Sequence, residues 1–255
     1  MALEDRDIVL LSGARTPFGV FMGSLKDISA IDLTTTAAKA AIERAGVAPG
    51  DIDQVVFGNV LQTSKDAIYF ARHVALKAGV PIEVPALTVN RLCGSGLQAI
   101  VSAAQSLLLG EGTVALAGGG ENMTQAPFVI RGARTGLALG EHPLEDYLWE
   151  ALTDSYVNCG MAITAENLAE KYDLSREQID EYALRSQVEA RKAQQSGIFS
   201  EEIVPVTVTD RKGRDYCASS KPRVRADCGS WMSTSALSKC RRSCSLRMAL
   251  EKSRS

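Results

Sequence analysis

The chain has 255 residues, of which 45% are hydrophobic and 23% are charged, with a net charge of −2. These values describe a soluble globular protein that is long enough for one large domain or two small ones. No apolar run reaches the length of a membrane span, so a helical membrane protein is excluded. The acidic N-terminus lacks the features of a secretory signal, and a cytoplasmic location is therefore expected.

The composition changes near residue 210. Residues 211–255 contain 12 Lys or Arg and three Asp or Glu, whereas residues 1–210 contain 16 and 27. Four cysteines lie in this basic segment, at positions 217, 228, 240 and 244. Their spacing lacks the two close pairs of a structural zinc site, and no aromatic or helical pattern supports nucleic-acid binding. We interpret residues 211–255 as a basic, disordered tail.

Strands and helices alternate along the first 120 residues. The pattern predicts strands at 7–12, 53–58, 84–89 and 113–117, and helices at 31–45, 67–78 and 97–109. This alternation implies an α/β fold with a mixed, mostly parallel sheet flanked by helices. The strands at 7–12 and 84–89 are expected to be buried. The helix at 97–109 is small or apolar almost all round, which is typical of a helix deep inside a domain.

A run of three glycines, residues 118–120, follows the fourth predicted strand. It lacks the G-x-G-x-x-G spacing of a phosphate-binding loop, and a tight turn at the strand end is favoured. Residues 123–161 show little periodicity and resemble a long functional excursion. Helices are predicted again at 164–172 and from a capping box at Ser175 to Ser196, with an alternating exposed strand at 203–209.

Cys93 lies between a predicted strand and a predicted helix, at the carboxyl end of the strand, where sites of parallel sheets are found. A helix start favours negative charge and stabilises a thiolate. Gly94 and Gly96 remove side-chain bulk, so that a substrate can approach the backbone closely. A cysteine beside an apolar run is also commonly an inert core residue. Context alone leaves both interpretations open.

Several segments together resemble the thiolase family. Residues 90–98 (Asn-Arg-Leu-Cys-Gly-Ser-Gly-Leu-Gln) are similar to its acyl-cysteine motif, and further similar motifs lie at residues 14–19, 58–62, 118–123 and 161–167. The resemblance extends from about residue 7 to about residue 213. Residues 144–149 and 160–162 are most similar to the 3-ketoacyl-CoA thiolases of fatty-acid degradation.

The resemblance implies a division of the chain and a chemistry. Residues 1–121 would form an N-terminal α/β domain, residues 122–210 a largely helical loop domain that covers CoA, and residues 211–255 the tail. Cys93 would be the nucleophile that carries the acyl group, with its own N–H contributing to the oxyanion site. Met161 would line the acyl and pantetheine pocket, although ordinary packing explains a methionine there equally well. CoA and acyl-CoA would be substrates, with no cofactor and no metal, and full-length members form dimers or tetramers.

The chain lacks three motifs that the family supplies from its C-terminal half, namely Gly-His-Pro, Cys-x-Gly and Asn-Glu-Ala-Phe in their usual context. Residues 141–143 (Glu-His-Pro) lie in the loop excursion without the preceding glycine, and His73 lies within a helical pattern. We therefore expect little or no thiolase turnover from this chain alone. The non-homologous tail is also consistent with a frame-shifted reading of the family sequence.

Three rival interpretations remain. The first is a biosynthetic condensing enzyme of the same superfamily. The second is a truncated, non-catalytic subunit that associates with a full-length thiolase through its exposed apolar surface. The third, a nucleic-acid binder that uses the basic tail, is disfavoured.

Overall fold

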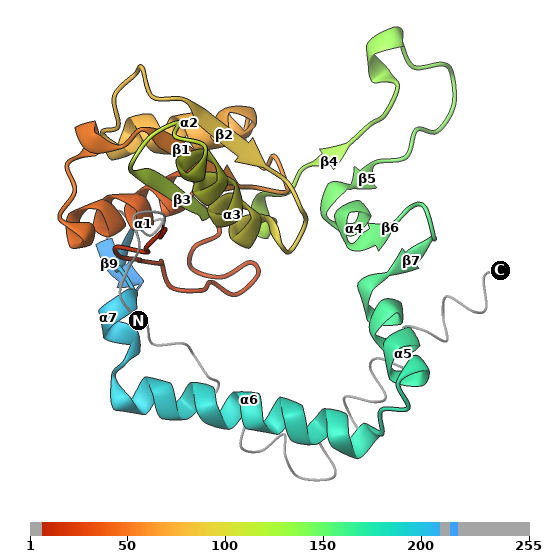
Figure 1. Ribbon diagram of the computed structural model, residues 1–255. Coiled ribbons are helices and arrows are strands. Elements are labelled where there is room, and N and C mark those ends of the chain that lie inside the picture. The colour runs from red at the N-terminus through yellow and green to blue at the C-terminus, as the bar shows by residue number, and fades with distance from the viewer. Residues whose placement is uncertain (1–6, 210–214, 219–255) are drawn as a thin grey trace.

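The computed structural model of the chain describes residues 7–209 and 215–218. Its centre is an α/β unit built on three parallel strands (Figure 1). These strands are β1 (Gln54–Gly58), β2 (Ala86–Val89) and β3 (Ala115–Gly119), in the spatial order β2-β1-β3. The predicted parallel α/β arrangement is confirmed for this unit.

The sheet lies between two helical layers because the side chains of β1 alternate between its faces. Val55 and Phe57 point into a core shared with α1 (Ala30–Ala45) and α2 (Phe70–Ala78), which follows a 3₁₀ turn, η2 (Ala67–Tyr69). Val56 points to the opposite face, where it packs on α3 (Ser95–Leu108). The two cores thus share one central strand.

Glycines in the left-handed conformation end three of the predicted helices. Gly46 after α1, Gly79 after α2 and Gly197 after α6 (Arg176–Ser196) have φ angles of 66°, 92° and 79°. A residue with a Cβ is disfavoured in this conformation, so glycine at this position stops a helix cleanly. The predicted ends of these helices are confirmed.

The predicted buried strand at residues 7–12 is wrong. This segment forms no strand, and Leu10 and Leu11 are 81% and 59% exposed. A groove of about 500 Å³ lies between residues 7–14 and β3, with α1 and α3 as its other walls. An apolar segment becomes a strand only when a hydrogen-bonding neighbour is in reach, and here the groove separates it from the edge of β3.

The predicted burial of β2 and α3 is wrong for this chain, although both elements exist, whereas the expected exposed apolar surface is confirmed. Leu87 on β2 is 53% exposed, because β2 is the edge strand of the sheet. On α3, Ala99 and Ala103 are buried against the sheet, whereas Leu97 and Leu108 are 70% and 61% exposed. Within the part of the chain that the structure describes, nothing forms a further layer over the outer face of α3.

The glycine run at 118–120 is not the predicted tight turn. Gly118 and Gly119 are the last two residues of β3, and the N–H of Gly120 donates to the carbonyl of Gly58. A Cβ on Gly120 would lie 1.9 Å from Oγ1 of Thr34, so close approach of α1 to the strand end requires glycine here. The run therefore serves packing between β3 and its neighbours.

Residues 128–202 form a long excursion from the α/β unit, which includes most of the predicted excursion at 123–161 and extends beyond it (Figure 1). In chain order it contains β4 (Phe128–Val129), 3₁₀ turn η4 (Ala133–Thr135), β5 (Glu145–Asp146), α4 (Tyr147–Leu152), β6 (Thr153–Asp154), β7 (Cys159–Gly160), α5 (Met161–Lys171), α6 and α7 (Phe199–Glu202). No residue from 123 to 202 is buried. The capping box at Ser175 is confirmed, since its hydroxyl accepts from the N–H of Gln178 and the Gln178 side chain accepts in return.

The excursion returns to the α/β unit at its far end. Strand β8 (Val206–Thr209) pairs antiparallel with β9 (Asp215–Ala218), and Val206 and Val208 pack on Leu33 of α1. Residues 215–218 belong to the predicted disordered tail, so the prediction is wrong for these four residues. Pairing with β8 supplies the backbone hydrogen bonds that stabilise the strand. The rest of the tail lies outside the described residues.

No helix among the described residues is long and apolar enough to cross a membrane. Two further 3₁₀ turns, η1 (Pro49–Asp51) and η3 (Met123–Gln125), complete the helical elements.

Candidate active site

Cys93 lies in the turn that links β2 to α3. Strand β2 ends at Val89 and α3 begins at Ser95, so the thiol is carried at the carboxyl end of the strand and just before the helix start. This placement confirms the predicted strand-to-helix turn. Cys93 is exposed, because the outer side of α3 is uncovered among the described residues. The thiol can therefore be reached from solvent.

The turn around Cys93 is held by two polar side chains. The Asn90 side-chain oxygen accepts a hydrogen bond from the N–H of Leu92 at 2.9 Å. The Ser95 hydroxyl accepts from the N–H of Arg91 at 2.9 Å and donates to the carbonyl of Leu92 at 2.6 Å. Leu92 has a φ angle of 48°, in the left-handed region that only a few per cent of residues other than glycine adopt.

Gly58 lets the beginning of α3 lie directly on the end of β1. A Cβ at Gly58 would come within 2.6 Å of the carbonyl carbon of Ser95 and 2.8 Å of its Cβ. Ser95 is only 5% exposed, so this contact is part of the packed interior. Gly96, by contrast, faces open space, because a Cβ added there would meet no atom within 4 Å. The backbone beside Cys93 is thus anchored on one side and accessible on the other.

Glu121 links the carboxyl ends of β1 and β3, at the same edge of the sheet as the Cys93 turn. Its carboxylate accepts hydrogen bonds from the N–H groups of Val60 and Leu61, at 2.9 and 3.3 Å, and from the Asn59 side chain at 3.1 Å. Burial raises the pKa of this carboxyl above its ordinary value, and the three donors oppose that rise. The side chain of Asn90 makes a long contact of 3.5 Å with the carbonyl of Val60, so this network adjoins the Cys93 turn.

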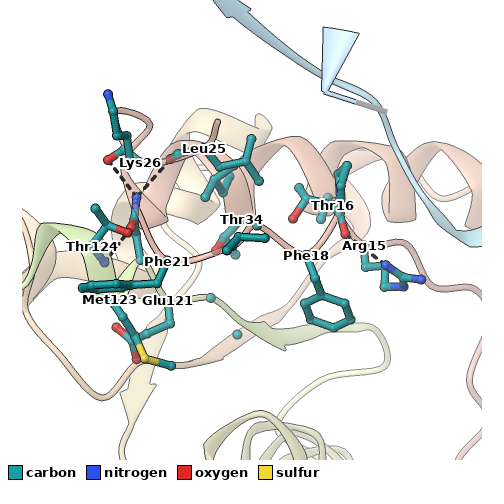
Figure 2. A pocket seen from close by; sticks show the side chains of 18 of the residues that line it. Arg15, Thr16, Phe18, Phe21, Leu25, Lys26, Thr34, Glu121, Met123 and Thr124 are labelled. Atoms are coloured by element: carbon teal, nitrogen blue, oxygen red, sulfur yellow. Dashed lines mark hydrogen bonds between the residues drawn. The ribbon is translucent and has the colours of Figure 1, made fainter. Parts of the chain in front are cut away.

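A cavity of about 460 Å³ lies between the loop at 14–21 and the segment at 119–124. Figure 2 shows Phe18 and Phe21 at opposite ends of this space, with Thr34 between them. Asn122 closes one side by donating to the carbonyls of Leu25, Lys26 and Ile28. Cys93 lines neither this cavity nor the groove beside β3. The thiol therefore lies on an open surface, outside both cavities.

The structure does not bring Met161 to Cys93. Met161 is the first residue of α5 and is 50% exposed, and α5 lies well away from α3 (Figure 1). Its assignment to the substrate pocket stays a prediction. His73 lies in α2, where its Nδ1 is 3.4 Å from Asp66, and His142 contacts the carbonyl of Ala138. Within the described residues, no three His, Cys, Asp or Glu side chains converge as a metal site requires.

Ser95, Gly58 and Glu121 have roles at the site that sequence reasoning missed. All three lie in segments that resemble family motifs, and that resemblance was the available signal. The contacts of Gly58 and Glu121 join residues more than 30 positions apart, which no local pattern reports.

Comparison with known proteins shows which family the chain resembles. The family model for the thiolase N-terminal domain matches residues 8–229, which extends beyond the predicted limit near residue 213. Human mitochondrial 3-ketoacyl-CoA thiolase is 50% identical over 210 residues, covering 82% of this chain and 53% of the relative. Beta-ketothiolase of Cupriavidus necator is 47% identical over 222 residues, covering 87% of this chain and 56% of the relative. The chain thus spans about half the length of these curated relatives.

Solved structures agree with the sequence comparisons. The crystal structure of human mitochondrial 3-ketoacyl-CoA thiolase in complex with CoA matches with a TM-score of 0.75 and 48% identity, covering 81% of this chain and 52% of that chain. The Bacillus anthracis acetyl-CoA acetyltransferase matches with a TM-score of 0.81 and 39% identity, covering 86% and 55%. The predicted thiolase-like α/β fold is therefore confirmed, and the chain belongs to the thiolase family.

Proposed function

We propose that this chain carries the nucleophilic half of a thiolase-type acyltransferase, with Cys93 as the residue that accepts the acyl group. The observation that carries this proposal is the exposed Cys93 at the junction of β2 and α3, in a chain of the thiolase family. The substrates would be CoA and acyl-CoA thioesters, and no cofactor would be required. The reaction would be thiolysis of a 3-ketoacyl-CoA or, in the opposite direction, condensation of acetyl-CoA.

The proposed reaction begins with attack of the Cys93 thiolate on the carbonyl carbon of a thioester. A bond forms between Sγ and the acyl carbon, and the bond to the CoA sulfur breaks, so that CoA leaves as a thiolate. In thiolysis, the thiolate instead attacks the 3-keto carbon of a 3-ketoacyl-CoA, the bond between carbons 2 and 3 breaks, and acetyl-CoA leaves as its enolate. The thiolate of free CoA then attacks the acyl carbon, and the bond from that carbon to Sγ of Cys93 breaks. The N–H of Cys93 would donate to the oxyanion that forms in each attack.

Several features of the described residues support this chemistry. The thiol precedes α3 at the carboxyl end of β2, where the sites of parallel sheets are found. The open space at Gly96 gives a thioester access to the backbone of the turn. The loop domain and Met161 would contribute the binding surface for CoA, with residues 1–121 as the N-terminal domain and 122–210 as the loop domain.

We further propose that the 255-residue chain alone turns over slowly. The sequence contains no Gly-His-Pro motif to activate the nucleophile and no second cysteine in the family's context to move the α proton. Removing one member of a catalytic unit can abolish most of the rate. A full-length thiolase would carry these groups in its own C-terminal half and would form a dimer or tetramer. Coupled thiolysis of acetoacetyl-CoA at the rate of a full-length thiolase would contradict this proposal.

Acylation of Cys93 is the direct test of the function. The full chain is incubated with acetyl-CoA, and peptide mass spectrometry locates the acetyl group. We expect the adduct on Cys93, its loss in Cys93→Ser, and its retention in the matched control Cys159→Ser, since Cys159 lies in β7. An adduct shared by both cysteines, or none on Cys93 after a long incubation at alkaline pH, where a thiol ionises without an activating histidine, would refute the assignment.

An alternative is a non-catalytic subunit that associates with a full-length thiolase. The exposed apolar face of α3, which includes Leu97 and Leu108, favours this second function. Co-purification of the two chains from the source, with no effect of Cys93→Ser on the activity of the complex, would support it. A cytoplasmic location also stays a proposal. Cell fractionation tests it, and recovery with mitochondria would contradict it.

A further inference from the structure

Leu92, the residue directly before Cys93, adopts a backbone conformation that its side chain disfavours. Its φ angle is 48°, in the left-handed region, where a branched apolar side chain crowds the backbone. Its side chain is 61% exposed, so packing of that side chain does not hold the conformation in place. This φ angle is one of the backbone angles that set the direction in which the chain runs on to Cys93. Other contacts must therefore keep Leu92 in the left-handed region.

The peptide groups on both sides of Leu92 are held by neighbouring side chains and by the backbone N–H groups of Gly94 and Ser95, which donate to the carbonyls of Arg91 and Leu92 at 3.1 and 3.0 Å. Asn90 accepts from the Leu92 N–H at 2.9 Å, and Ser95 accepts from the Arg91 N–H at 2.9 Å. Ser95 also donates to the Leu92 carbonyl at 2.6 Å. Both ends of the Leu92 residue are thus bound, and a rotation to negative φ would break at least one of these hydrogen bonds.

The Ser95 end of this arrangement is anchored to the sheet. Ser95 is 5% exposed, and its backbone lies so close to Gly58 of β1 that no Cβ fits between them. The hydroxyl is therefore held in place by the contact of α3 with the central strand. The position of the turn is therefore set by the packed contact between Ser95 and Gly58, and not by the exposed side chains of the turn.

We propose that Asn90 and Ser95 are positioning residues for Cys93, which hold Leu92 in the left-handed conformation and so orient the thiol for attack. This inference rests on the proposed function of Cys93. Neither side chain contacts the reacting atoms, and both act through the backbone of Leu92. Loss of either hydrogen-bonding group lets Leu92 relax to negative φ and turns Cys93 away from the approach beside Gly96.

The test combines Ser95→Ala with Leu92→Asn in the full chain. Asparagine adopts the left-handed region more readily than leucine, so it keeps the turn in place without the serine hydroxyl. We expect Ser95→Ala to slow acetylation of Cys93 by acetyl-CoA about tenfold, which corresponds to about 1.4 kcal/mol. In the Leu92→Asn background the same change should slow it less than about threefold. Ser106→Ala, about three turns further along α3, is the matched control and should leave the rate unchanged.

A purely structural role of the hydroxyl gives a different pattern. It would lower the melting temperature and slow acetylation equally in both backgrounds, and that result would overturn the proposal, as would a wild-type rate in Ser95→Ala. If Ser95→Ala does not fold, Asn90→Ala and Asn90→Asp replace it. The aspartate keeps an acceptor for the Leu92 N–H and should restore the rate that alanine loses, whereas equal rates in the two variants would refute the role.

A crystal structure of Ser95→Ala, or of Asn90→Ala, separates this inference from the proposed function. If wild-type Cys93 accepts no acyl group, the proposed function fails, yet the φ angle of Leu92 still reports on the positioning role. A negative φ in the variant and a positive φ in Ser106→Ala support the inference. A positive φ in both overturns it.

Discussion

Replacement of Gly58 by alanine tests the contact that carries the Cys93 turn. The added Cβ would lie 2.6 Å from the carbonyl carbon of Ser95 and 2.8 Å from its carbonyl oxygen. These are backbone atoms at the start of α3, so no side-chain rotation relieves the clash. Strand β1 is also fixed, because it pairs with β2 on one side and with β3 on the other. The helix start must therefore move away from the sheet.

The displacement is close to 1 Å, because carbon atoms in contact are ordinarily about 3.5–4.0 Å apart. Overpacking of this kind destabilises a protein by about 1–3 kcal/mol. We expect about 3 kcal/mol here, because neither β1 nor the backbone at the start of α3 can yield easily. For a chain of this size that loss lowers the melting temperature by about 6–12 °C. A catalytic group misplaced by about 1 Å loses about a hundredfold in rate, so acetylation of Cys93 should fall by that factor.

The assay is urea unfolding together with the rate of Cys93 acetylation at a temperature where the variant is folded. Gly50→Ala is the matched control, since a Cβ there meets nothing within 4 Å. The control should keep both the stability and the rate. A Gly58→Ala protein with a free energy of unfolding within about 0.5 kcal/mol of wild type, the range of ordinary surface changes, would refute the packing argument.

Three further predictions concern hydrogen bonds away from the thiol. Burial raises the pKa of Glu121, so its contribution to stability is fully present below its unfolded pKa and is lost as the pH rises through the folded value. Wild type should therefore gain free energy of unfolding relative to Glu121→Gln between about pH 7 and pH 4, and urea titrations that show a constant difference would contradict this. The pKa of Asp53 is lowered, because its carboxylate accepts from the N–H groups of Thr113 and Val114 and from the Thr113 hydroxyl. Its contribution to stability is therefore present above the unfolded pKa and is lost as the pH falls through the folded value. Asp53→Asn should lower the free energy of unfolding at pH 7, and the difference from wild type should vanish as the pH falls through the lowered pKa. Urea titrations in which the difference persists in acid would contradict the role of the ionised carboxylate. Ser175→Ala removes the cap of α6 and should destabilise that helix by about 1 kcal/mol. Because α6 buries no residue, amide hydrogen exchange in its first turns should rise while global unfolding stays unchanged, and an equal loss of global stability would show that α6 is coupled to the core.

Much of the candidate site was predictable from the sequence, because its position follows from local signals. The placement of Cys93 between a strand and a helix came from apolar runs, and the helix ends at Gly46 and Gly79 came from the need for a left-handed residue. The resemblance to the family motif then favoured Cys93 as the nucleophile, and this role stays a prediction. Each of these signals lies within a few residues of the feature that it predicts.

Burial could not be predicted in the same way. Apolarity all round α3 indicated a deeply buried helix, yet only the face with Ala99 and Ala103 is covered. Apolarity at residues 7–12 indicated a strand, yet a groove lies where a hydrogen-bonding neighbour would be. An apolar pattern states what a segment can bury, whereas the neighbours within reach decide whether it does so.

By itself, the sequence determined the parallel α/β arrangement, the helix ends, the long excursion and the family of this protein. Only the tertiary structure decided which surfaces stay open and how the turn at Cys93 is held. The family motif at residues 58–62 marks Gly58, but the reason for glycine there appears only where the start of α3 meets β1. The left-handed Leu92 likewise lies between two hydrogen bonds, since its N–H donates to the Asn90 side chain and its carbonyl accepts from the Ser95 hydroxyl. Local propensity favours another conformation at Leu92, and these hydrogen bonds override it because they bind both of its peptide groups at once, with Ser95 itself anchored by its contact with Gly58.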